Sequence, residues 1–150
     1  MKLRLPRLAR DERGTSLIEF GFVAPFLALL TMGIIDLSRG LAERFALQSA
    51  VSRSLELVQA RPAAASATAN DVDYSFVKTE AAAAAGVPES QVTLTRWLQC
   101  NDTEKPDVNG TCAAGEASAR YLRVRITKNF QGDFYFATVP MSASGTLRTQ

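Results

Sequence analysis

Histidine is absent from this chain of 150 residues, and only two cysteines are present. Without histidine the protein lacks the commonest general base and the commonest metal ligand. The two cysteines, Cys100 and Cys112, are too few for a structural zinc site, and their spacing is not that of a Cys-x-x-Cys redox motif. No glycine-rich phosphate loop and no Gly-x-Ser-x-Gly elbow occurs. The sequence therefore predicts neither an enzyme nor a site for a cofactor, a metal or a small-molecule substrate.

An excess of charge of one sign is also missing, because 17 basic side chains stand against 15 acidic ones. This balance argues against a nucleic-acid partner. The C-terminal half contains one basic strip, formed by Arg120, Arg123, Arg125 and Lys128. Its alternation is that of a strand with one side facing solvent. The first fourteen residues, by contrast, are rich in positive charge, with Lys2, Arg4, Arg7, Arg10 and Arg13 against Asp11 and Glu12.

A long apolar run extends from Leu17 to Ile35, and Glu19 is its only charged residue. As a helix these 19 residues extend nearly 30 Å, the thickness of the hydrocarbon core of a bilayer. A cleaved secretory signal is the weaker interpretation, because the run is long and the small-x-small site at residues 40–42 lies behind charged residues. We expect a basic leader at residues 1–14, a transmembrane segment at 15–37 and a separate domain at 38–150.

The flanking charges predict the orientation of this segment. The leader is net positive, whereas the charges of Asp36, Arg39, Glu43 and Arg44 cancel. The positive-inside rule then places the leader in the cytoplasm and the domain outside. The two cysteines agree, because an oxidising compartment lets them form a disulfide. We expect a single-pass protein of the inner (cytoplasmic) membrane with a periplasmic or extracellular C-terminal domain.

Glu19 is the unusual residue of the span. A carboxylate in hydrocarbon costs about 3 kcal/mol on insertion scales, so it either lies shallow or has a cationic partner. Cleavage after Gly14 would free an amine on Thr15, about 6 Å along the helix from Glu19. The carboxylate could then neutralise the amine of its own or of a neighbouring subunit, at the end of the helix where the macrodipole favours negative charge.

Residues 13–20, RGTSLIEF, resemble a prepilin processing site, in which a basic leader and a glycine precede a glutamate and an aromatic residue. Residues 13–54 resemble the TadE-like pseudopilins of Tad/Flp type IV pilus systems. In that family a proline such as Pro25 interrupts the span, and a Gly-Ile-x-(Asp/Glu)-x-x-Arg run, here Gly33 to Arg39, closes it. Phe20 departs from the tyrosine usual in major Flp pilins, which favours a minor subunit.

This resemblance implies a minor pilin or pseudopilin, a structural subunit for assembling or anchoring a pilus used in adhesion and surface attachment. It implies cleavage between Gly14 and Thr15 by a prepilin peptidase, and a role in assembly for Glu19 and Phe20. The implied partners are the membrane, that peptidase, other pilin subunits and the assembly platform. An unprocessed envelope protein with a periplasmic binding domain, or a secreted protein, remains the alternative. Candidates for packing against neighbouring helices, with lipid exposure as the alternative, are Phe22, Phe26, Leu29 and Leu30.

Beyond the span, apolar residues recur at helical spacing and predict one helix from Thr15 to Ala60, with Pro25 as a candidate kink and a break near Gly40 as the alternative. Residues 62–70 form a predicted linker. A second helix should then run from Asp71 to Ala85, capped by Asn70 and stopped by Gly86. The core is expected to begin at Val72, Phe76 and Val77.

Alternating residues predict strands at 91–98 and 121–128, with a less regular edge strand within 134–147 that contains Pro140. The predicted fold is therefore α+β and pilin-like, a long helix and a second helix with a small antiparallel sheet packed on the helical stem.

The loop from Cys100 to Cys112 lies between the first two predicted strands. A disulfide there would contribute about 3 kcal/mol in the chain-entropy model, and two reduced thiols are the alternative. This loop contains the acidic and amide residues Asp102, Glu104, Asp107 and Asn109. Their spacing is not that of a calcium site and indicates a solvated turn.

Overall fold

The computed structural model describes residues 15–60, 74–134 and 137–149. Helix α1 (Thr15–Ala60) is followed by α2 (Ser75–Ala85), a short 3-10 helix η3 (Glu89–Gln91) and the strands β1 (Val92–Cys100), β2 (Thr103–Lys105), β3 (Ser118–Phe130) and β4 (Val139–Arg148). The sheet has the order β2-β1-β3-β4, and all neighbouring strands are antiparallel. The predicted α+β fold is confirmed.

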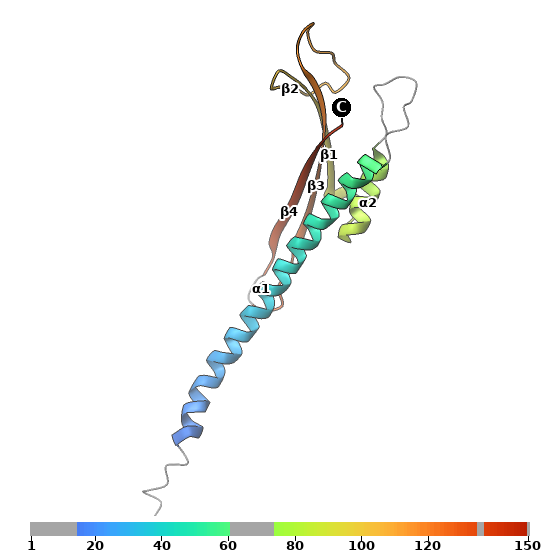
Figure 1. Ribbon diagram of the computed structural model, residues 1–150. Coiled ribbons are helices and arrows are strands. Elements are labelled where there is room, and N and C mark those ends of the chain that lie inside the picture. Colours follow the sequence, from blue (N-terminus) through green and yellow to red (C-terminus); the bar gives the residue numbers. More distant parts are fainter. Residues whose placement is uncertain (1–14, 61–73, 135–136, 150) are drawn as a thin grey trace, which may run out of the picture.

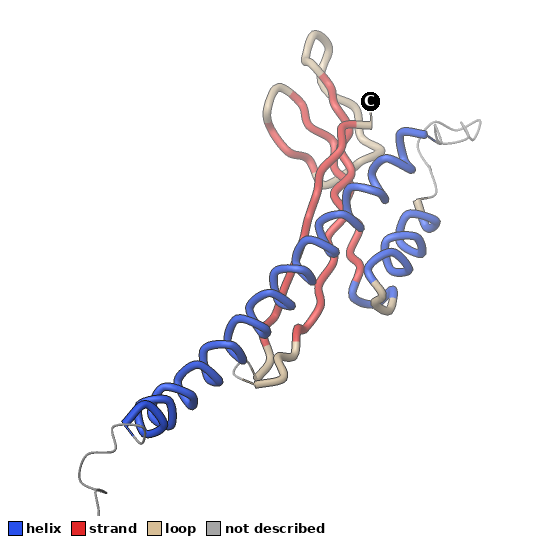
Figure 2. The backbone as a smooth tube through the Cα atoms, turned by 60° about the horizontal axis from the view of Figure 1, so that its bottom comes forward, coloured by secondary structure: helices blue, strands red, loops and turns tan. Residues whose placement is uncertain are grey.

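Helix α1 is the stem of the molecule. Its C-terminal half runs along the sheet, while its N-terminal half extends free of it (Figures 1 and 2). The helix is unbroken over 46 residues and passes through Pro25 and Gly40, so the predicted continuity past Gly40 is confirmed. Proline has no backbone N–H, so Pro25 lacks one of the hydrogen bonds of the helix.

The side of α1 that faces the sheet begins at the end of the apolar run. Buried residues on this side recur at intervals of three and four, which keeps them on one face of a helix. Leu37, Leu41 and Phe45, which share the helical spacing of the buried Val51 and Val58, point away from this face and are exposed. The buried residues of α1 are Asp36, Leu47, Ala50, Val51, Ser54 and Val58.

Helix α2 begins later than predicted. Tyr74 has ψ 16° and lies outside the helix, so a helix running unbroken from Asp71 is wrong, and the first helical residue is Ser75. The proposed cap Asn70, the linker 62–70 and Val72 lie outside the described residues. The predicted end is confirmed, because Gly86 is in the left-handed conformation with φ 62° and follows Ala85 directly. Only glycine adopts this conformation without steric cost.

The sheet matches the three predicted strands and adds a fourth. The strand expected at an edge is β4, whose Pro140 lies opposite Asn129 of β3. An edge strand tolerates proline because one side of it makes no ladder hydrogen bonds. Strand β2 was not predicted, because Thr103–Lys105 is short, polar and wholly exposed and therefore lacks any apolar alternation.

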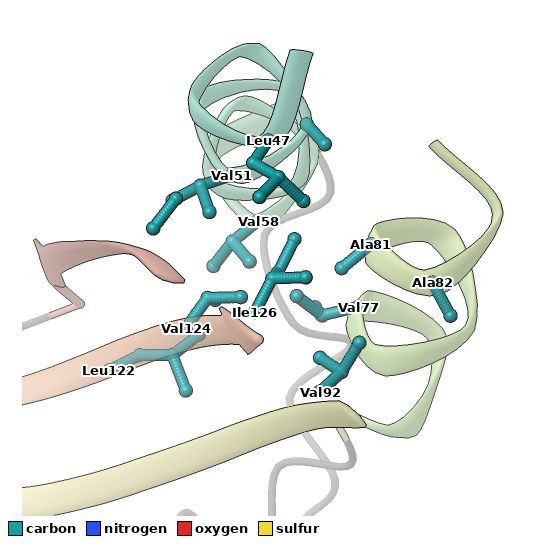
Figure 3. Packing of buried hydrophobic residues seen from close by; sticks show 12 residues of the cluster. Leu47, Val51, Val58, Val77, Ala81, Ala82, Val92, Leu122, Val124 and Ile126 are labelled. Atoms are coloured by element: carbon teal, nitrogen blue, oxygen red, sulfur yellow. The ribbon is translucent and has the colours of Figure 1, made fainter. Parts of the chain in front are cut away.

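Both helices contribute to one hydrophobic core against the same face of the sheet (Figure 3). Val77 of α2 is completely buried, as expected, and the sheet contributes the equally buried Leu122, Val124 and Ile126 of β3. Arg123 and Arg125 alternate with these residues and lie on the opposite, solvent-facing side. The core therefore ties the C-terminal half of α1 to the sheet and leaves the N-terminal half out of the domain.

At Gly145 of β4 the strand lies close against α1. A Cβ atom at this position would lie 2.7 Å from Cδ1 of Leu55 and 2.8 Å from Cγ1 of Val51. Both distances are shorter than van der Waals contact, and Val51 is β-branched and stiff at χ1. A side chain at residue 145 would therefore push the helix away from the strand.

We predict that Gly145→Ala destabilises the domain by about 1–3 kcal/mol through overpacking. Denaturant unfolding of the detergent-solubilised chain, followed by the fluorescence of the single tryptophan, measures this loss. Ser144→Ala is the matched control, because Ser144 is exposed on the same strand and its replacement should leave stability within about 0.5 kcal/mol of wild type. Equal stability of the two variants would contradict the close packing of α1 on β4.

Candidate functional site

The free half of α1 is a surface of large apolar side chains. Phe22 and Phe26 are each 71% exposed, and Leu30 is 58% exposed. Helix α1 is long and apolar enough to cross a membrane, and none of the residues in its most apolar 18-residue stretch is buried. Because water is a poor solvent for so much contiguous apolar surface, this half needs lipid or other helices around it.

The predicted assembly residues lie at the free end of this helix. Thr15 is the first helical residue, and Glu19 and Phe20 follow in the first two turns with exposed side chains. Among the described residues, no cation is paired with Glu19. Gly14, the other half of the predicted processing site, lies outside the described residues. The structure therefore leaves the Glu19 carboxylate accessible to a group from outside the described chain.

Asp36 stands where the apolar segment ends and the domain begins. Its side chain is completely buried, although it directly follows an exposed apolar run. The two carboxylate oxygens accept hydrogen bonds from the backbone N–H groups of Asp133 and Phe134, each at 3.0 Å. These residues belong to the connection between β3 and β4, which lies beside the middle of α1 (Figure 1). Asp36 thus fastens the end of the β3–β4 hairpin to the helix.

Two ion pairs reinforce this attachment. Arg39 pairs with Asp133, and Glu43 pairs with Lys128 of β3. The Arg39–Asp133 pair is more than half exposed, so it contributes less than about 1 kcal/mol. Phe130 and Met141 lie against Gly40 between the two pairs. We call Asp36, Arg39, Asp133 and Phe134 the hairpin clamp.

The Gly33-to-Arg39 run is visible in the sequence, but the clamp that it forms is not. The signal in the sequence was an aspartate and an arginine at i and i+3, which lie on one face of a helix. The partners of these two side chains lie far along the chain, and Asp133 is 97 residues beyond Asp36. Two of those partners are backbone N–H groups, which carry no residue signature, so the contact could not be read from residue types.

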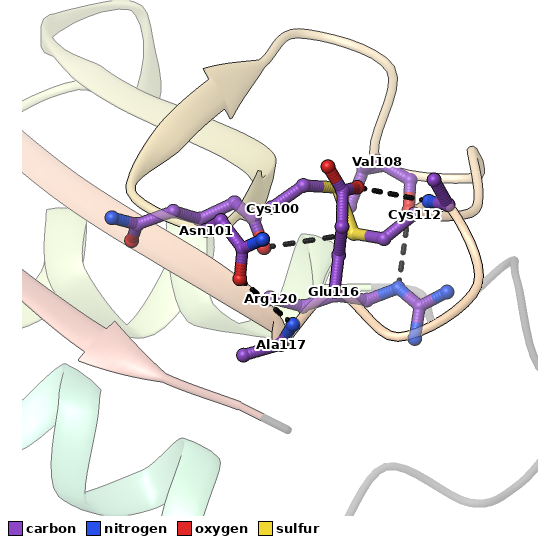
Figure 4. The surroundings of a disulfide bond; sticks show 9 residues. Cys100, Asn101, Val108, Cys112, Glu116, Ala117 and Arg120 are labelled. Carbon is purple, nitrogen blue, oxygen red and sulfur yellow. Dashed lines mark hydrogen bonds between the residues drawn. A yellow bond between two sulfur atoms is a disulfide. The ribbon is translucent and has the colours of Figure 1, made fainter.

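At the other end of the sheet, the structure joins Cys100 and Cys112 in a disulfide, with Cα atoms 5.6 Å apart (Figure 4). The loop is further held by Arg120, whose Nε donates to the carbonyl oxygen of Val108, and by Asn101, which accepts from the N–H of Ala117. Glu116 lies near the two sulfur atoms. Sulfurs joined in a disulfide are not thiolates and are therefore poor metal ligands, so this cluster does not indicate a metal site.

The basic strip of β3 does not form one patch. Arg120 is engaged by the disulfide loop and Lys128 by Glu43, whereas Arg123 and Arg125 lie on the outer face of the sheet. The guanidinium of Arg123 stacks over the indole ring of Trp97 at 4.7 Å from its centroid. Such cation–π contacts stabilise by about 0.5–1 kcal/mol at exposed sites, so a structural role accounts for this arginine.

These features together define a single-pass membrane protein with an α+β head fastened to the base of its anchor helix. The model of the TadE-like protein family matches residues 14–54. This match, over less than a third of the chain, confirms the resemblance seen in the sequence to a family of structural, pilus-associated proteins. It covers the span, the Gly33-to-Arg39 run and the first part of the buried face of α1. No curated protein and no solved structure matches the chain.

We predict that Asp36→Ala destabilises the domain by about 2–3 kcal/mol, because two N–H donors lose a charged acceptor. Hydrogen exchange of the amides of Asp133 and Phe134 measures the effect locally, and both should lose protection. Arg39→Ala is the control at the same end of the domain, with a loss below about 1 kcal/mol. Retained protection at both amides in Asp36→Ala would contradict the clamp.

Proposed function

We propose that this protein is a minor pilin-like subunit that helps to build or anchor a Tad/Flp-type pilus. Residues 1–14 are the leader, residues 15–37 cross the inner membrane, and residues 38–150 form a domain outside the cytoplasm. A prepilin peptidase cuts between Gly14 and Thr15. The mature subunit then joins other pilin or pseudopilin subunits and the assembly platform, in an appendage that serves adhesion and surface attachment.

The observation that carries this proposal is the TadE-like match over residues 14–54 on a helix whose most apolar stretch has no buried residue. Only the C-terminal part of α1 packs on its own domain. Such a helix suits a subunit whose N-terminal part is first surrounded by lipid and later by the helices of other subunits. In both environments the apolar side chains of residues 17–35 stay out of water. The head can stay folded in the two states because its contacts with α1 begin at Asp36, after the apolar run.

The orientation is supported by the charges on either side of the span and by the disulfide. Positive charge gathers before residue 15, whereas two of the charges just beyond the span are neutralised by the pairs Arg39–Asp133 and Glu43–Lys128. Disulfides persist in oxidising compartments, which fits a head outside the cytoplasm.

The exposed carboxylate of Glu19 gives assembly a chemical driving force. Cleavage at Gly14 places a cationic amine on Thr15, and this amine lies about 6 Å along the helix from Glu19. In a low-dielectric environment an unpaired carboxylate is costly, so pairing with the amine of a neighbouring subunit favours the assembled state.

We predict that the mature protein begins at Thr15, and mass spectrometry of the membrane-extracted chain measures this directly. Gly14→Val should abolish cleavage, because a bulky residue then precedes the cut. Gly21→Val is the matched control and should be processed normally, since a Cβ atom at residue 21 meets nothing within 4 Å. An intact Met1 in the wild type would favour an unprocessed envelope protein with a binding domain, and a start near Glu43 would favour a secreted protein.

We predict that Glu19→Ala inserts into the membrane normally but assembles poorly. If the pairing contributes about 1.4 kcal/mol per subunit, incorporation into sheared pilus fractions should fall about tenfold relative to the membrane pool. Glu56→Ala is the control, because Glu56 is an exposed carboxylate of the same helix outside the span. Normal incorporation of Glu19→Ala would remove the proposed pairing.

A further inference from the structure

In the part of the chain that the structure describes, large apolar side chains outside the span are exposed at one end of the domain only. Among the described residues, those of α1 lie within ten residues after the apolar run, and the others lie at the start of β4 and in the connection before it. The distal parts of the sheet and α2 expose none. The five residues are Leu37, Leu41, Phe45, Phe134 and Val139.

The hairpin clamp fixes the height of the exposed Phe134 along α1. Its backbone N–H donates to the Asp36 carboxylate at 3.0 Å, and Asp36 is the first residue after the apolar run ends at Ile35. The side chain of Phe134 is 53% exposed even though its backbone is tied down. Phe134 therefore lies at the level at which the helix leaves the hydrocarbon.

Distances along the helix place the same residues within the headgroup region. This region is about 5–8 Å thick on each side of the hydrocarbon core. Leu37 follows Asp36 directly, and Leu41 lies about 8 Å beyond it along the helix axis. Phe45 is about 14 Å beyond and falls outside the region for an upright helix. Leu37, Leu41 and Phe134 thus share a level next to the membrane.

Leu37 and Leu41 lie on the side of α1 that points away from the sheet, whereas Phe134 belongs to the hairpin, so the three residues share a level but not one face. Successive residues of a helix point about 100° apart, so Leu37 points well away from Asp36 and from the hairpin that Asp36 holds. A single partner helix would need its contacts on one side of the stem, whereas a bilayer surrounds the stem at one height. The neighbouring charges also suit an interface of low dielectric constant, because Arg39 and Glu43 are each paired within the domain.

We propose that Phe134, in the connection between β3 and β4, is a second membrane contact and is inserted into the headgroup region of the leaflet from which α1 emerges. Two contacts, the span and this hairpin end, hold the domain at a fixed tilt on the bilayer. Apolar side chains at this depth gain from leaving water, and aromatic side chains are common there. The inference rests on α1 crossing the bilayer and does not depend on assembly into a pilus.

Tryptophan scanning of the full chain tests this contact, because the protein has a single tryptophan, Trp97. In a Trp97→Phe background, Phe134→Trp is compared with Phe26→Trp in the span and with Ser144→Trp on the exposed outer side of β4. Each variant is reconstituted into vesicles of phosphatidylcholine and phosphatidylglycerol without bromine, with phosphatidylcholine brominated high on its acyl chains to report on residue 134, and with phosphatidylcholine brominated near the chain ends to report on residue 26, which lies at the middle of the span. Bromine quenches tryptophan only at short range, so the loss of emission reports contact with lipid.

We expect Phe134→Trp and Phe26→Trp to lose emission in the brominated vesicles, with blue-shifted spectra, and Ser144→Trp to remain unquenched. Quenching of Phe26→Trp without quenching of Phe134→Trp would overturn the inference and leave the anchor intact. A blue-shifted but unquenched Phe134→Trp would overturn it in favour of a protein neighbour. Failure to quench Phe26→Trp would remove the membrane span itself, and the inference with it.

Discussion

The buried carboxylate of Asp36 separates two environments along one continuous helix. Before it, the side chains of α1 are exposed and apolar, and after it one face of the same helix is packed against the sheet. A buried carboxylate is unfavourable unless hydrogen-bonded donors compensate it, and here the two backbone N–H groups of Asp133 and Phe134 do so. The domain is thereby fastened to α1 at the residue where the apolar run stops.

The rest of the structure depends on this fastening. Without it the hairpin would be held to this part of the stem by the Glu43–Lys128 pair and by Phe130 and Met141 against Gly40, and further along by the packing of Val51 and Leu55 against Gly145. With it, α1 and the sheet are joined at both ends of the hairpin, so the head moves with the helix as one unit. If the subunit leaves the membrane during assembly, as proposed, a movement of its span then moves its head by the same amount, because no flexible joint separates the two.

Much of this arrangement could be predicted from the sequence, because it depends on local patterns. The apolar run and the helical spacing after it gave α1 correctly from Thr15 to Ala60, and the alternation around Leu122, Val124 and Ile126 gave the central strand. The left-handed stop at Gly86 follows from the conformational freedom of glycine.

The parts that could not be predicted depend on contacts between distant residues. The helical spacing treated Leu41 and Val51 alike, yet Leu41 is exposed and Val51 is buried, because the position of the sheet decides which face is covered. The basic strip of β3 was likewise divided, since Lys128 meets Glu43 of α1 whereas Arg123 stacks on Trp97. The start of α2 was placed too early because Asn70, followed by Asp71 and Asp73, has the composition of a helix N-terminus, and such a local signal does not fix where the helix begins.

The central claim is that residues 17–35 lie in lipid with the head in an oxidising compartment, and thiol accessibility in fractionated cells tests it most directly. Alkaline extraction separates membrane-spanning from soluble chains, and a membrane-permeant maleimide added before lysis labels every free thiol. We predict that the chain stays in the membrane pellet and that Cys100 and Cys112 are labelled only after reduction. A full-length chain in the soluble cytosol with both thiols labelled at once would contradict this account.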